Sequence, residues 1–317
     1  ALHVGHWGTF VRTPLVSDEV ARVEVLTRVV NDSDLAKDCL LLTTVVDGEG
    51  RQVGETESRH PLAPGQAYEF VQRIRVPQPH LWSVDDPYLY TVRSTVKDSA
   101  DVVDRYETPL GIREMEFDAD EGFLLNGQRV KINGVCLHHD GGCVGAAVPE
   151  RVWERRLETL KAMGCNGIRS SHYPPAPEFL ALCDRMGFLV MDETFDEWTI
   201  GKFAYGYHDF FEEWAIRDTV SMVRRDRNHP SVVIWSVGNE IPEQTVPEGV
   251  EVLETLMDVV HLEDPTRPVT SACDNIEAHI PATEAFLEAL DVVGYNYVDR
   301  WAERRELYYS IDRERYP

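Results

Sequence analysis

The sequence predicts a multidomain protein: an immunoglobulin-like β-sandwich over residues 1–115, followed by an incomplete (β/α)8 TIM barrel over residues 116–317. Three observations predict this fold. Hydrophobic residues alternate in the first third of the chain, and turn-forming clusters separate the alternating runs. Apolar strands and amphipathic helices then follow each other in turn, as parallel strands with helical crossovers require. Ionisable and amide side chains end strand after strand in this second part.

The first domain is predicted from its alternating strands. The runs "AYEFVQRIRV" and "PYLYTVRSTV" are two examples, and the clusters "DGEG" and "APGQ" supply turns. The predicted inward residues of the two runs are Tyr68, Phe70, Ile74, Val76, Tyr88, Tyr90, Val92 and Val96. The Cys…Trp…Cys core of antibody domains is absent, so the pattern predicts the sandwich architecture alone.

The second domain is predicted as the first six βα units of a barrel. Its strands are predicted at 130–135, 165–173, 188–193, 231–240, 268–272 and 291–297. Helices are predicted between them, one ending near Gly164 and one beginning near Pro177 and ending at Gly187. A third helix is predicted to bury Ile216, Val220 and Val223. The strands are continuous apolar runs, which is typical of parallel strands buried on both faces.

A doubly wound sheet would give the same alternation of strands and helices. A dinucleotide-binding sheet should carry a GxGxxG turn after a strand, and the sequence has none. A barrel instead predicts polar residues at the carboxyl end of strand after strand. Five predicted strands end in this way, at His138-His139-Asp140, Arg169 to Tyr173, Asp192-Glu193, Asn239-Glu240 and Asn296-Tyr297. The pattern therefore favours the barrel.

Composition narrows the function. The chain carries 31 Lys+Arg and 55 Asp+Glu, so its formal net charge is 31 − 55 = −24. Such a charge repels nucleic acid and anionic membranes, and no apolar run approaches the roughly 20 residues of a membrane span. The six cysteines show no CxxC spacing, so neither a zinc ribbon nor a disulfide framework is expected. A neutral carbohydrate fits as ligand, while the compartment and homo-oligomer formation stay open.

Each candidate residue also has a structural interpretation. Adjacent strand residues point to opposite faces, so His138 and His139 are poorly placed to share a metal ion. Arg169 is a candidate structural cation paired with Asp192 or Glu193. The acids at 192–193 and 196–197 could equally form a solvent-exposed acidic surface, but such a surface does not require arginine, histidine, asparagine and tyrosine at the neighbouring strand ends.

Two long segments give a specific resemblance. "GCNGIRSSHYPPAPEFLALCDRMGFLVMDETFDEW" and "RNHPSVVIWSVGNE" resemble the catalytic barrel of glycoside hydrolase family 2, and within it the β-galactosidase branch. The resemblance extends from "LHVGHWGTFV" through the sandwich to "DVVGYNY", which is nearly the whole chain. It implies a retaining double displacement by two carboxylates that lie about 5–5.5 Å apart.

The resemblance also implies roles for named residues. Glu240 matches the acid/base, which must carry a proton near neutral pH to protonate the glycosidic oxygen. Asn239 matches the asparagine that binds the hydroxyl beside the reacting carbon. The implied substrate-binding residues are His138, Arg169, His172, Asp196, Trp198, Asn239, Asn296 and Tyr297. Glu197 matches a magnesium ligand of some relatives, but Thr199 stands where they have histidine, so no cofactor is expected.

The resemblance implies hydrolysis of terminal β-linked galactose. β-Glucuronidase and a non-catalytic carbohydrate-binding module stay open as alternatives, although the residues at 174–177 and 195–198 resemble the galactosidase more. In the family the nucleophilic glutamate ends strand 7, and only six strands are counted here. The chain is therefore expected to be a fragment without the nucleophile, inactive on its own.

Overall fold

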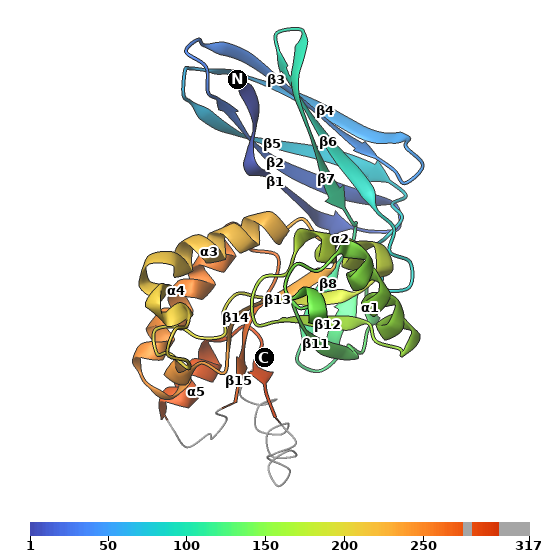
Figure 1. The fold of residues 1–317 in the computed structure, drawn as a ribbon. Coiled ribbons are helices and arrows are strands. Elements are labelled where there is room, and N and C mark those ends of the chain that lie inside the picture. Colours follow the sequence, from blue (N-terminus) through green and yellow to red (C-terminus); the bar gives the residue numbers. More distant parts are fainter. Residues whose placement is uncertain (275–280, 298–317) are drawn as a thin grey trace.

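Two antiparallel sheets form the first domain in the computed structural model, which describes residues 1–274 and 281–297 (Figure 1). One sheet has the order β1-β2-β5, and the other has the order β4-β3-β6-β7. The strands are β1 (Leu2–Val16), β2 (Val20–Asn31), β3 (Lys37–Val46), β4 (Gln52–Leu62), β5 (Ala67–Pro77), β6 (Tyr90–Asp98) and β7 (Asp101–Leu110). The predicted sandwich is confirmed.

The alternating pattern places most of the predicted sandwich core correctly, but Tyr88 lies before β6 and is only partly buried, and Tyr68 is a second exception. Phe70, Ile74 and Val76 of β5 are buried, whereas Tyr68 is 38% exposed. The Tyr68 ring stacks on His60 of the neighbouring sheet at 3.7 Å between centroids. An aromatic ring can cover a sheet edge without entering the core, and period-two counting does not separate these cases.

A small three-stranded sheet follows the sandwich and was not predicted. It contains β8 (Met115–Asp118), β9 (Gly122–Leu125) and β10 (Gln128–Arg129). Phe123 and Leu125 are buried in one cluster with residues at the starts of barrel strands, namely Leu189, Val233 and Ile234. This sheet therefore covers apolar side chains at the amino-terminal end of the barrel.

The second domain is a six-stranded parallel sheet that follows chain order from β11 to β16. The strands are β11 (Gly134–His138), β12 (Gly167–Ser171), β13 (Leu189–Glu193), β14 (Val232–Asn239), β15 (Val269–Cys273) and β16 (Gly294–Tyr295). An order that never reverses is that of a barrel, so the predicted partial barrel is confirmed.

The first barrel strand begins later than the prediction of 130–135. Asn166 accounts for the difference, because its side-chain amide donates to Lys131 O at 2.9 Å and accepts from Asn133 N at 2.7 Å. These side-chain bonds take the place of a strand partner for residues 131–133. Regular pairing with β12 starts at Gly134.

In the described part of the chain, helices connect successive barrel strands and lie on the outer side of the sheet (Figure 1). They are α1 (Glu150–Ala162), α2 (Pro177–Met186), α3 (Phe211–Asp226), α4 (Glu248–Glu263) and α5 (Pro281–Ala289), with short 3-10 turns at Gly142–Val144, Tyr207–Asp209 and Pro242–Thr245. As predicted, Pro177 opens α2, and Gly187 follows it with a φ of 70°. Among the described helices, none combines the length and apolar character needed to cross a bilayer.

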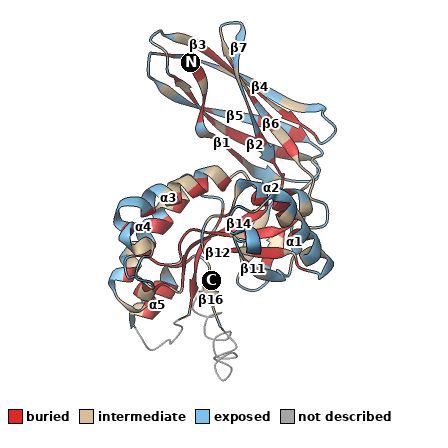
Figure 2. Cartoon of the chain, viewed as in Figure 1, coloured by how far each residue is buried: buried red, intermediate tan, exposed pale blue. Residues whose placement is uncertain are grey.

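The buried face of α3 differs from the prediction. Val223 is buried as predicted, but Ile216 is 41% exposed, and the helix also buries Phe211, Ala215, Thr219, Met222 and Asp226. This stripe contains a small, a hydroxyl and a charged residue, which a search for large apolar residues misses. Figure 2 shows the buried residues concentrated on the inward sides of the helices and along the central strands. Every residue of β14 is buried.

Candidate active site

The parallel order of the sheet brings the carboxyl ends of its strands to one edge. His138 ends β11, Arg169 lies in β12, Glu193 ends β13 and Asn239 ends β14. Asn296 directly follows β16. Polar side chains from strands far apart in sequence therefore meet at this edge, as they do at the active face of barrel enzymes.

An ion pair between Arg169 and Glu193 forms the centre of the cluster. Arg169 Nε and Nη2 donate to Glu193 Oε2 at 2.9 and 2.8 Å. The Glu193 side chain has no exposed surface, and it also contacts His172 Nδ1 at 2.7 Å and accepts from Ser236 Oγ at 2.5 Å. A buried carboxylate with this many partners is held in one position, and it fixes Arg169 and His172 in turn.

The sequence left open whether Arg169 pairs with Asp192 or Glu193, and the structure shows Glu193. Neighbouring strand residues face opposite sides, so Asp192 lies on the other face of β13. There it is fully buried beside Asp226, and its Oδ2 atom receives no hydrogen bond from any donor in the described ranges. Burial, and then the neighbouring Asp226 carboxylate, raise the pKa of Asp192 well above its ordinary value.

This shift predicts a pH dependence of stability. A carboxyl group with a raised folded-state pKa stabilises the fold fully below its unfolded pKa, about 3.9, and loses that contribution as the pH rises through the folded pKa. Asp192→Asn keeps the neutral shape and removes the titration. We therefore expect the difference in unfolding free energy between Asp192→Asn and wild type to grow in favour of Asp192→Asn by at least about 1 kcal/mol as the pH rises from 5 to 8.

Urea denaturation at the two pH values checks this prediction. The exposed residue Asp34 supplies the control, because Asp34→Asn should shift stability by a similar amount at both pH values. A difference between wild type and Asp192→Asn that does not change with pH would show that Asp192 is ionised throughout.

Asn239 connects the centre of the cluster to a second ion pair. Its Oδ1 atom accepts from Arg169 Nη2 at 2.8 Å, and its Nδ2 atom donates to Asp196 Oδ1 at 2.8 Å. Lys202 Nζ donates to the same Asp196 oxygen at 3.0 Å and to Asn239 O at 2.7 Å. Burial acts to raise the pKa of Asp196, but the hydrogen bonds from Asn239 and Lys202 outweigh it and lower that pKa. Asp196 is therefore held as an anion.

Glu240 lies at the mouth of the cluster, directly after β14. Its Oε1 atom accepts from Asn296 Nδ2 at 2.8 Å, and its backbone N–H donates to Ala272 O at 2.7 Å. Glu240 has a φ of 48°, in the left-handed region that a residue with a side chain adopts only when its surroundings hold it there. Asn296 Nδ2 also donates to Asn239 Oδ1 at 3.1 Å, so one amide positions both residues at the end of β14.

Of the remaining predicted substrate-binding residues, His138 lies in the cluster, Tyr297 is partly exposed and Trp198 is buried away from it. The rings of His138 and His172 lie 5.3 Å apart, edge to face, so His138 belongs to the cluster. Tyr297 follows Asn296 and is 42% exposed. Trp198 is fully buried among hydrophobic residues, and its Nε1–H donates to Val237 O at 2.8 Å. The predicted role of Trp198 in a sugar subsite is corrected here, because a side chain without exposed surface offers no contact to a ligand.

The hydrogen bonds made by Glu197 do not fit a magnesium site. Glu197 Oε2 accepts from Lys202 N at 2.6 Å, and Oε1 accepts from His208 N at 3.2 Å. These contacts and His208 Nδ1 lower the pKa of Glu197, against the burial that acts to raise it. Thr199 Oγ1 donates to Glu243. Backbone and side-chain donors of the protein already occupy the carboxylate oxygens of Glu197, which a magnesium ion would need as ligands. The described residues also contain no group of three side chains that could hold a metal ion together.

Sequence reasoning missed two contributors. Ser236 lies inside the apolar run of β14, where a serine has no distinctive signal, yet it donates to Glu193. Lys202 lies in the segment between β13 and α3, which has no period to place it, yet it contacts both Asp196 and Asn239. Contacts made by loops depend on tertiary packing, so local sequence did not indicate them.

Two family descriptions match the chain. "Glycosyl hydrolases family 2" matches residues 3–113, and "Glycosyl hydrolases family 2, TIM barrel domain" matches residues 118–312. Together they cover both the sandwich and the barrel, and the second match contains every residue of the cluster.

Individual relatives agree in fold and differ in the activity they are named for. The chain is 45% identical to the β-galactosidase BoGH2A of Bacteroides ovatus, over 93% of this chain and 38% of that protein. It is 30% identical to a β-glucuronidase of Bacteroides fragilis, over 84% of this chain and 38% of that protein. A family 2 member from Bacteroides cellulosilyticus superposes with a TM-score of 0.91 at 40% identity, covering 96% of this chain and 39% of the other. The chain thus spans less than two fifths of the length of these relatives.

Proposed function

Since the chain belongs to glycoside hydrolase family 2, we propose that its cluster forms part of the sugar site of a retaining β-galactosidase. Glu240 is the acid/base of this site. The observation that carries the proposal is the placement of Glu240 at the mouth, held by Asn296, next to the Arg169, Asn239 and Glu193 cluster. The chain spans under two fifths of its relatives, so the activity of a whole enzyme is part of the proposal.

Glu240 acts twice in this scheme. In the first step its carboxylic acid gives a proton to the glycosidic oxygen while a carboxylate nucleophile bonds to the sugar carbon, so that the glycosidic bond breaks and the aglycone leaves as an alcohol. In the second step its carboxylate takes a proton from water, the water oxygen bonds to the sugar carbon, and the bond between that carbon and the nucleophile breaks. Asn296 donates to Glu240 throughout and keeps the carboxyl group aimed at the reacting oxygen.

The charges of the cluster favour a neutral sugar. Arg169 is neutralised by Glu193, and Lys202 is neutralised by Asp196. His172 also contacts Glu193. Neither Arg169 nor Lys202, the permanently charged cations of the cluster in the described residues, is therefore left without an acidic partner to receive a sugar carboxylate. β-Glucuronidase is the second candidate, because relatives of that name share the barrel.

Competitive titration of the 317-residue chain with galactose and glucuronate tests the substrate proposal. We expect galactose to bind at least about fivefold more tightly, because glucuronate adds a charge that finds no free cation. Asn239→Ala should abolish the galactose response, whereas Asn133→Ala, at an exposed position outside the cluster, should leave it unchanged. Tighter binding of glucuronate would move the assignment to β-glucuronidase.

The nucleophile is a separate question. Glu193 and Asp196 are the carboxylates bonded to this cluster besides Glu240, and both accept hydrogen bonds from a cation. The Glu193 side chain has no exposed surface, and Asp196 Oδ1 already accepts from Lys202 and Asn239, so we infer that neither carboxylate attacks the sugar carbon. We therefore expect the chain alone to bind galactosides without hydrolysing them. An assay with an aryl β-galactoside checks this, and turnover that disappears in Glu240→Gln would contradict it.

A further inference from the structure

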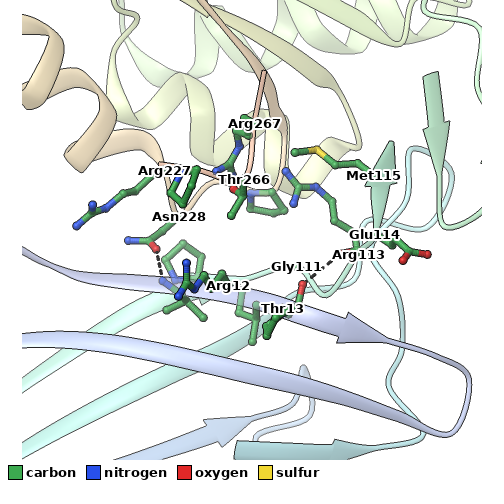
Figure 3. Close-up of a pocket in the computed structure, with 16 residues that line it drawn as sticks. Arg12, Thr13, Gly111, Arg113, Glu114, Met115, Arg227, Asn228, Thr266 and Arg267 are labelled. Atoms are coloured by element: carbon green, nitrogen blue, oxygen red, sulfur yellow. Dashed lines mark hydrogen bonds between the residues drawn. The ribbon is translucent and has the colours of Figure 1, made fainter. Parts of the chain in front are cut away.

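A cleft lies between the two domains, well away from the sugar site. It encloses about 390 Å3, and β1, the segment after β7 and the loops before β14 and β15 contribute to its walls (Figure 3). Arg113, which lines the cleft, contacts the carbonyl of Val232 at the start of β14. Asn239 of the sugar cluster ends the same strand. At about 3.3 Å per residue, the two ends of this eight-residue strand lie roughly 23 Å apart.

The cleft is basic in a chain whose formal net charge is −24. Four arginines line it: Arg12, Arg113, Arg227 and Arg267. Three of them have acidic partners in the structure, since Arg12 pairs with Glu24, Arg227 with Glu263 and Arg267 with Asp264. Glu114 also lines the cleft, but Figure 3 shows its carboxylate turned outward.

Arg113 differs from the other three arginines. Its hydrogen bond within the described residues runs from Nη2 to Val232 O, at 2.7 Å. Its Nε atom is buried and has no hydrogen-bond partner, as is also true of Arg227 Nε, but Arg227 has an acidic partner in Glu263 and Arg113 has none among the described residues. A guanidinium carries five N–H donors, and leaving such a donor unsatisfied away from water is costly. In Figure 3 the side chain reaches from the segment after β7 toward Thr266 and Arg267.

The groups packed around the Arg113 guanidinium include a second cation, and the two buried acids near it, Asp264 and Asp184, have other partners. Arg267 Nε donates to the same Val232 carbonyl at 2.7 Å, so two guanidinium groups share one acceptor. Asp264 accepts from Arg267 at 2.6 Å, and Asp184 contacts His229 at 2.6 Å, so both nearby acids already have partners. Burial, and then Arg267, lower the pKa of Arg113 to about 9. A bound anion would offset both effects.

We propose that this cleft binds a small oxyanion, phosphate or sulfate, with Arg113 as its principal ligand. The Arg113 guanidinium, which has no acidic partner among the described residues, offers its remaining Nη donors in the fixed planar geometry that suits such oxygens, and Arg12 lines the same cleft. The volume exceeds that of a free ion, so the cleft also accommodates an anionic group carried by a larger molecule. This site is independent of the glycosidase assignment, because it shares no residue with the sugar cluster.

The experiment titrates sodium phosphate, and separately sodium sulfate, into the 317-residue chain at constant ionic strength maintained with chloride. The first readout is the Nε–H resonance of Arg113 in ¹⁵N-labelled protein, identified by its loss in Arg113→Lys. We expect this resonance to shift saturably with one site per chain. Calorimetry should show at least about tenfold weaker binding in Arg113→Gln, because a charge-assisted contact is lost. The exposed Arg217 on α3 supplies the control, Arg217→Gln, which should bind as wild type does.

Galactose 6-sulfate provides a further arm that separates two sources of the anion. Tighter binding than that of inorganic sulfate, with the same loss in Arg113→Gln, would place the anion on a saccharide, whereas equal or weaker binding would identify the free ion. The proposal would be overturned by an Arg113 resonance that does not shift or that shifts equally with chloride. An affinity that is unchanged in Arg113→Gln would also overturn it. Should Arg113→Gln fail to fold, the resonance titration of the wild-type chain still decides.

Discussion

Replacement of Glu240 by alanine in a catalytically active form of the enzyme is expected to slow hydrolysis of a β-galactoside with a sugar leaving group by about 10²–10⁴-fold. A sugar alkoxide is a poor leaving group and needs the proton that Glu240 gives. An activated aryl leaving group departs without that proton, so we expect a much smaller loss in the first step with a nitrophenyl galactoside. The measurement is kcat/KM for both substrates, because that parameter reports the first irreversible step.

The matched control is Glu248→Ala, since Glu248 is an exposed glutamate in the first turn of α4. It should leave both rates within about twofold of wild type, as expected for a surface substitution. Equal losses on the two substrates in Glu240→Ala would instead indicate that Glu240 contributes to binding or folding and not to proton transfer.

Removal of Arg169 is expected to destabilise the barrel substantially. Arg169→Ala leaves the Glu193 carboxylate, which has no exposed surface, without its bidentate partner. Breaking one side of a buried ion pair costs about 3–5 kcal/mol, because an uncompensated charge stays behind. Urea denaturation of the chain should therefore show a loss of unfolding free energy of about 3 kcal/mol, the lower end of that range because His172 and Ser236 still contact Glu193.

Arg217→Ala is the control for this prediction, because Arg217 lies on the exposed face of α3 in a surface pair with Glu213. It should cost less than about 0.5 kcal/mol. The double variant Arg169→Ala, Glu193→Ala should be less destabilised than the sum of the single variants, since neither charge is then left buried alone. A loss below about 1 kcal/mol in Arg169→Ala would show that Glu193 does not depend on this arginine.

The fold was predictable where one period dominates a segment. The alternation in "PYLYTVRSTV" and the apolar run before Asn239 are both strong local signals, and a strand formed at each, although β6 begins at Tyr90 and leaves Tyr88 outside it. The strand-end residues were predictable as a group, because parallel strands present their carboxyl ends at one edge. Arg169, Asn239, Glu240 and Asn296 meet there and are joined by hydrogen bonds.

What the sequence did not indicate depends on three-dimensional packing. Trp198 stands two residues after Asp196, and the chain alone did not show that its ring turns into the core while the carboxylate faces the cluster. Lys202 reaches the cluster from an irregular segment. Arg113 lies in a short connection between domains, and its lack of an acidic partner becomes visible only when the loops before β14 and β15 surround it.

The assignment of Glu240 as the acid/base of a sugar site is tested most directly by a crystal structure of the 317-residue chain with an intact β-galactoside. We predict the galactose ring at the carboxyl ends of β11 to β16, with a Glu240 carboxyl oxygen within about 3.2 Å of the glycosidic oxygen and Asn239 bonded to the adjacent hydroxyl. A galactoside bound elsewhere on the chain, or one whose glycosidic oxygen faces Glu193 or Asp196 with Glu240 out of reach, would contradict the assignment.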